Sequence, residues 1–115
     1  MHRDIELTNW TAVCSLDQIV PNTGVCALLN GEQVAVFHVL DAEEQVFAIG
    51  NVDPNSGVSV LSRGLVGSLG ERIVVASPIC KQHFDLFTGE CLEAPEHSVP
   101  SYRARVEDGK VWVCA

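Results

Sequence analysis

The sequence predicts an all-β fold, an antiparallel sandwich or small barrel of about eight to ten short strands. Three observations support this prediction. Short apolar runs recur along the chain and are separated by turn residues. Two dipeptides, Asn30-Gly31 and Asp108-Gly109, are typical of two-residue β-hairpin turns. The Gly-, Ser- and Pro-rich stretch 52–72 carries no helical period longer than about two turns.

The strands are expected at regular intervals, with few other elements between them. A single helical turn at 15–19, capped by Ser15, follows the first strand. An acidic turn at 41–44 precedes the fourth strand, and Pro95 and Pro100 bracket an irregular connection before the last hairpin. The expected strands are 10–14, 25–29, 33–39, 45–50, 73–77, 83–87, 101–107 and 110–114.

Length and composition limit the class of protein. At 115 residues, of which 47% are hydrophobic, the chain is expected to form one domain, 1–115, with its own core. A net charge of −8 argues against a nucleic-acid partner, because such proteins need clustered Lys and Arg. The chain has no apolar run long enough to span a membrane, and its acidic start does not resemble a secretory signal. We therefore expect a cytoplasmic protein.

The five cysteines are expected to be free thiols, as is usual in a reducing compartment. Cys14, Cys26 and Cys114 lie in apolar runs, where a free cysteine usually packs as a small hydrophobic residue. Cys80 and His83 have C-x-x-H spacing. This is half of the set of two Cys and two His that holds a Rieske-type [2Fe–2S] centre.

The segments 48–57 and 77–89 resemble the Rieske fold. Members of that family carry C-x-H-x-G in one loop and C-P-x-H-G-x-x-F-D-x-x-T-G in a second. In frame with the first motif, Gly57 takes the position of the glycine, Asp53 that of the cysteine and Asn55 that of the histidine. A carboxylate and an amide are poor ligands for cluster iron.

The second loop aligns without gaps when it is anchored on the F-D-x-x-T-G part of the motif, residues 84–89. Ser77 then takes the cysteine position, Cys80 the histidine position and Lys81 the glycine position, while His83 falls on no ligand position. An alternative alignment puts Cys80 and His83 on the ligands, but it needs a deletion and loses the proline match. The gapless alignment replaces all four ligands, so the resemblance implies no metal and no cofactor on this chain.

Four residues are therefore predicted at vestigial ligand positions: Asp53, Asn55, Ser77 and Cys80. We expect Asp53 and Asn55 to join the two loops by hydrogen bonds in place of metal bonds. Cys80 is predicted to be a reactive thiol because Lys81 lies beside it, and it is a candidate to approach Cys91 across the intervening turn.

Within the Rieske-like group, the chain resembles the small subunits of assimilatory NAD(P)H-dependent nitrite reductases. The most specific match is I-G-N-V-D-P at 49–54, supported by S-P at 77–78, G-E-C-L at 89–92 and the closing hairpin. The resemblance implies a large catalytic partner subunit with FAD, an iron–sulfur cluster and sirohaem, which reduces nitrite to ammonium. It places no catalytic residue on this chain, whose role would be docking or support through loops 51–57 and 77–82.

Two other classes of protein stay open at this point. One is an electron-carrying [2Fe–2S] Rieske ferredoxin, which the C-x-x-H pair would favour. The other is an unrelated β-sandwich binding module. No zinc site or Ser-His-Asp grouping can be assembled from the sequence, and His38 is expected to be a hydrogen-bonded residue of the core or its rim.

Overall fold

The structure is a computed structural model that describes residues 10–40 and 46–114. It contains nine strands and three short 3-10 helices, and no α-helix is present in the described residues. The strands are β1 (Trp10–Ser15), β2 (Thr23–Leu29), β3 (Glu32–His38), β4 (Val46–Gly50), β5 (Leu65–Leu69), β6 (Arg72–Ala76), β7 (His83–Asp85), β8 (Ser101–Glu107) and β9 (Lys110–Cys114). The 3-10 helices are η1 (Leu16–Gln18), η2 (Leu61–Arg63) and η3 (Pro95–His97).

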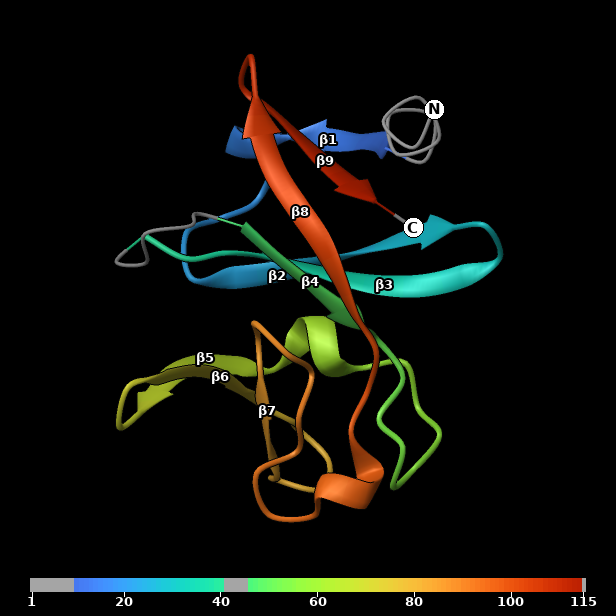
Figure 1. The fold of residues 1–115 in the computed structure, drawn as a ribbon, viewed down its shortest axis with the longest axis vertical. Coiled ribbons are helices and arrows are strands. Elements are labelled where there is room, and N and C mark those ends of the chain that lie inside the picture. The colour runs from blue at the N-terminus through green and yellow to red at the C-terminus, as the bar shows by residue number, and fades with distance from the viewer. Residues whose placement is uncertain (1–9, 41–45, 115) are drawn as a thin grey trace, which may run out of the picture.

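The strands form two antiparallel sheets that lie one above the other in Figure 1. The large sheet has six strands in the order β1-β9-β8-β4-β3-β2, and the small sheet has three in the order β5-β6-β7. The chain therefore leaves the large sheet after β4, builds the small sheet, and returns to pair β8 with β4. This all-β arrangement confirms the predicted fold class.

Alternation along β3 and β4 divides the core into two clusters, because successive side chains of a strand point to opposite faces. Phe37 and Ile49 face Val75 and Phe84 of the small sheet. Val34 and its neighbours on the other face pack against Val111 and other residues of β9. Since β9 belongs to the same sheet, the large sheet must curl to bring these residues together. All five residues of β4 are buried, as expected for a central strand covered on both faces.

Both predicted hairpins are present. Asn30 and Gly31 have φ angles of 52° and 81°, and Asp108 and Gly109 have 54° and 74°. Positive φ at both central residues is the type I′ geometry that Asn-Gly and Asp-Gly favour. These turns set the register of β2 with β3 and of β8 with β9.

The structure differs from the expected element list in two places. Strand β5 lies within the stretch 52–72, for which no strand was predicted. It is a mostly exposed edge strand in which Gly67 and Ser68 interrupt the apolar pattern, and it pairs with β6. The strand expected at 83–87 ends at Asp85, because the Asp85 carboxylate accepts hydrogen bonds from the backbone N–H groups of Phe87 and Thr88 and starts a turn.

Several side chains can also be compared with expectation. All five cysteines are free thiols, as predicted, but Cys26 is exposed and does not pack as a core residue. Its hydrogen-bond partners are polar, the side chains of Gln33 and Asn51. His38 is buried and its Nδ1 lies 3.0 Å from the carbonyl oxygen of Ile19, which confirms the prediction for it. The turn predicted at 41–44 lies outside the described residues.

None of the helical segments within 10–40 and 46–114 has the length and apolar character needed to cross a membrane.

Candidate functional site

The four predicted positions lie in two loops, 51–60 after β4 and 77–82 after β6, which we call the loop pair. Asn51, the first residue of the predicted contact loop 51–57, anchors the first loop. Its side chain is buried, accepts a hydrogen bond from the Ser62 backbone N–H at 2.7 Å and donates to Gln33 at 3.3 Å. Its backbone carbonyl accepts from the N–H groups of Val60 and Leu61, so both ends of the loop are tied to one residue.

Asp53 and Ser77 form the inner contact of the loop pair. The Ser77 hydroxyl donates to Asp53 Oδ2 at 2.6 Å, and the two residues are 0% and 1% exposed. The other carboxylate oxygen accepts the backbone N–H of Asn55 at 2.8 Å. Burial disfavours the charged form of Asp53, but these donated hydrogen bonds outweigh it and lower the pKa of its carboxyl group.

Asn55 and Cys80 form the outer contact. The Asn55 side-chain amide lies 3.5 Å from the Cys80 sulfur and donates to Gln82 Oε1 at 2.7 Å. The same Gln82 oxygen lies 3.9 Å from the Cys80 sulfur and 3.4 Å from the Cys91 sulfur. Gln82 therefore gathers both thiols and Asn55 around one acceptor. Sequence reasoning did not assign this role to Gln82, because the partners come from three separate segments.

The backbone of the loop pair retains a left-handed conformation at both glycine positions of the family motifs. Gly57 has a φ of 74° and Lys81, which aligns with a glycine, has a φ of 64°. A residue with a Cβ is uncommon in this region of φ. The geometry of the second loop thus follows the gapless alignment although the glycine is gone.

His83 points its ring at a different partner. Its Nδ1 lies 2.6 Å from the Glu93 carboxylate, which also accepts the His83 backbone N–H at 2.8 Å. The donated backbone N–H of His83 is the main cause that lowers the pKa of Glu93. The C-x-x-H spacing therefore does not produce a paired site in the structure.

The rest of the second motif has a structural explanation. Phe84 is fully buried, and Asp85 starts the turn described above. Gly89 has a φ of 83°, and a Cβ there would collide with the carbonyl oxygen of Val99. These positions shape the fold whether or not a metal is bound.

The chemistry of the donor set does not fit a Rieske cluster. The four positions offer a carboxylate, an amide, a hydroxyl and one thiol, where a cluster needs two thiolates and two imidazoles. Across the described residues, no group of three or more His, Cys, Asp and Glu side chains is arranged to hold a metal ion.

Comparison with known proteins places the chain in a family. The family model of the Rieske-like [2Fe-2S] domain matches residues 9–114, so the chain belongs to that family. Within the family it falls among the nitrite reductase (NADH) small subunits. It is 50% identical over 105 residues to the small subunit of Escherichia coli K12, which covers 91% of this chain and 96% of the relative. The alternative of an unrelated β-sandwich binding module is therefore wrong.

Two further relatives extend the comparison. The solution structure of the nitrite reductase [NAD(P)H] small subunit of Erwinia carotovora is 48% identical with a TM-score of 0.80, covering 94% of this chain and 82% of that one. A nitrite reductase [NAD(P)H] large subunit of Klebsiella oxytoca is 41% identical over 104 residues, which are 90% of this chain but 11% of that one. In the Klebsiella protein, a domain like this one is thus part of the large-subunit polypeptide.

Proposed function

We propose that this chain is a cluster-free Rieske-like subunit that docks on the large subunit of an NADH-dependent nitrite reductase. It has no catalytic site of its own. FAD, the iron–sulfur cluster and sirohaem would all belong to the large subunit, and the complex would act in the cytoplasm on nitrite. The observation that carries the proposal is the pair of hydrogen-bonded contacts between the two loops.

These contacts match the way in which a Rieske cluster divides its ligands. In such a centre, two cysteines hold one iron and two histidines hold the other. Asp53 and Ser77 take the two cysteine positions and bond each other, and Asn55 and Cys80 take the two histidine positions and also contact each other. Each pair that would share an iron is therefore joined directly, which supports a loop pair that holds its shape without metal.

Docking is supported by the relatives and by the surface of the loop pair. A small subunit implies a large one, and the Klebsiella relative carries both in a single chain. Three large apolar residues of the loop pair are exposed, Val52 at 41%, Val58 at 42% and Ile79 at 48%. Exposed apolar side chains on a small domain are a feature of contact surfaces. We assign this surface to the large subunit.

Two measurements test the proposal. The purified chain is expected to be colourless, with no acid-labile sulfide and no bound iron; visible absorbance together with sulfide would instead support an electron-carrying ferredoxin. The large subunit is expected to oxidise NADH with nitrite faster when this chain is added than when it is left out. Equal rates with and without the chain would contradict its role as a functional subunit.

A further inference from the structure

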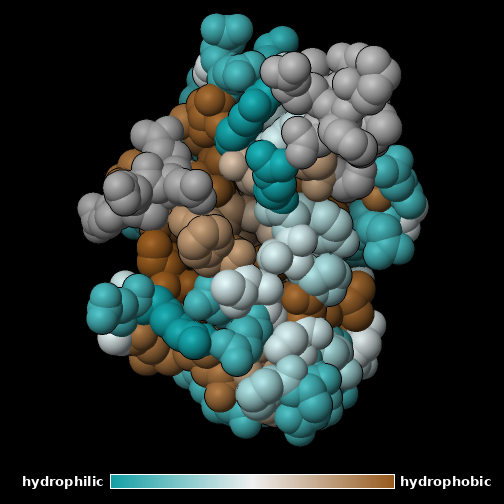
Figure 2. Space-filling view, in the orientation of Figure 1, coloured by the Kyte–Doolittle hydropathy of each residue, from teal (hydrophilic) through white to brown (hydrophobic). Residues whose placement is uncertain are grey.

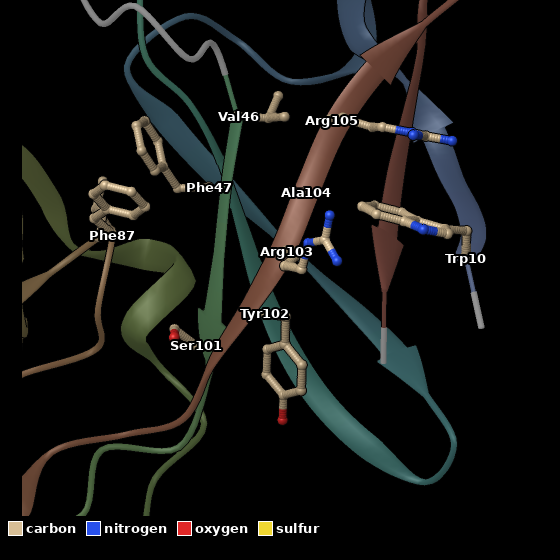
Figure 3. Close-up of a pocket in the computed structure, with 10 residues that line it drawn as sticks. Trp10, Val46, Phe47, Phe87, Ser101, Tyr102, Arg103, Ala104 and Arg105 are labelled. Atoms are coloured by element: carbon tan, nitrogen blue, oxygen red, sulfur yellow. The ribbon is translucent and has the colours of Figure 1, made fainter. Parts of the chain in front are cut away.

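A groove of about 470 Å³ lies away from the loop pair, between the large sheet and the turn that follows β7 (Figure 3). We call it the arginine–aromatic groove and define it by Trp10, Phe47, Phe87, Arg103 and Arg105. None of the residues that line it belongs to the loop pair. The two surfaces can therefore be changed independently.

The alternation of side chains along β8 places two arginines at one end of the groove. Tyr102 and Ala104 of β8 pack inward, so Arg103 and Arg105 point outward. Trp10 lies opposite Cys114 of β9, which in turn lies opposite Arg103. The Trp10 ring is 4.5 Å from the Arg105 guanidinium carbon and 5.6 Å from that of Arg103, within the range of cation–π contacts. Figure 3 shows both guanidinium groups beside the indole.

Two phenylalanines form the apolar end. The Phe47 and Phe87 rings meet edge to face with their centroids 6.4 Å apart. Phe47 is buried, whereas Phe87 is 71% exposed at the tip of the turn that Asp85 starts. Figure 2 shows brown, apolar surface on this face of the molecule, between the two sheets. An aromatic ring held this far into solvent by an ordered turn gains stability when a partner covers it.

The charge of the groove indicates which side chains a partner segment would carry. The chain has a net charge of −8 and only seven Lys and Arg residues, and two of the seven stack on Trp10 in this groove. Arg105 also lies 3.6 Å from the Glu107 carboxylate, an exposed ion pair of the weak kind that a partner carboxylate can replace. Trp and Arg are also the residues most enriched among those that dominate binding energy at protein interfaces. A basic, aromatic site on an acidic domain is complementary to carboxylates flanked by an apolar side chain.

We propose that the arginine–aromatic groove is a second docking face, which binds a segment of the large subunit that carries acidic side chains next to an apolar one. The acidic side chains pair with Arg103 and Arg105, and the apolar side chain covers Phe87. This inference rests on the proposed docking of the chain to the large subunit. The groove provides charged contacts, whereas the exposed side chains of the loop pair are apolar. Charged contacts make binding sensitive to salt.

The test measures the affinity of the full-length chain for the purified large subunit by titration calorimetry at low and high salt. The double variant Arg103→Glu/Arg105→Glu is expected to bind about tenfold or more weakly and to lose most of the salt dependence. Its control, Lys110→Glu, reverses an exposed charge on β9 outside the groove and should bind within about twofold of wild type.

A second pair of variants examines the apolar end. Phe87→Ala is expected to weaken binding by about tenfold. Leu65→Ala is its control, because Leu65 is 81% exposed but does not line the groove. Circular dichroism and melting temperature establish that each variant is folded before its affinity is measured.

The outcomes separate the two proposals. Wild-type chain that does not bind the large subunit would overturn the proposed function, and the groove proposal with it. Wild-type chain that binds, with groove variants that bind equally well, would overturn only the groove proposal. Equal losses for Lys110→Glu and the arginine variant would mean that overall charge, not the groove, steers binding, and would also overturn it.

Discussion

The two contacts that join the loop pair differ in burial and in strength, although both stand at former ligand positions. The inner contact, Asp53 with Ser77, is fully buried and 2.6 Å long. The outer contact, Asn55 with Cys80, involves an exposed amide and a sulfur 3.5 Å away. A buried hydrogen bond to a charged group is worth more than an exposed bond to a thiol. The inner contact is thus suited to hold the loops together, and the outer one to present a surface.

The largest expected difference is in stability. Asp53→Ala leaves the Ser77 hydroxyl and the Asn55 backbone N–H without their acceptor, so we expect a loss of about 2–3 kcal/mol in the free energy of unfolding. Asn55→Ala is the matched change in the outer contact and should cost less than about 1 kcal/mol. Urea denaturation of both single variants and of the double variant measures these values. A double variant with wild-type stability and loop order would refute the bridging role of both residues.

A smaller effect on stability is expected when the pH is lowered. Of the two contacts, only the inner one should be affected. Because the folded-state pKa of Asp53 is lower than its unfolded value near 3.8, its ionisation stabilises the fold above that pH. This stabilisation is lost as the pH falls below about 4 towards the folded pKa. Asp53→Asn should be less stable at neutral pH and should show a flatter acid dependence, measured as urea midpoints from pH 3 to pH 7. Parallel curves for the variant and the wild type would contradict this assignment.

The smallest effect concerns the two thiols that share Gln82. Cys91 is 0% exposed and burial raises the pKa of its thiol, whereas Cys80 is half-buried beside the outer contact. We expect iodoacetamide to label Cys80 faster than Cys91 in the native protein, because the thiolate is the reactive form. Mass spectrometry of the wild type, with Cys80→Ser and Cys91→Ser as references, measures both rates. Faster labelling of Cys91 than of Cys80 would contradict this expectation.

Enhanced reactivity of Cys80 through Lys81 stays a prediction. A labelling rate no faster than that of a free cysteine in a model peptide would refute it.

The sequence by itself determined the two hairpins and most of the strands. Asn30-Gly31 and Asp108-Gly109 specify their turns through local φ preferences, a continuous apolar run specifies β3, and alternating side chains specify β8. These signals are local, so one amino-acid sequence is enough to recognise them. Family resemblance added the loop assignment, in which Asp53, Asn55, Ser77 and Cys80 replace the ligands.

Only the tertiary structure decided which residues meet. The apolar pattern of strand β5 is interrupted by Gly67 and Ser68, so its pairing with β6 is visible only in the structure. Gln82 likewise reaches Cys91 from a different loop. The arginine–aromatic groove requires β1, β4, β8 and the turn after β7 to converge. Contacts between segments far apart in sequence depend on how the large sheet curls. The packing of the whole core sets that curl, so no single stretch of the sequence predicts it.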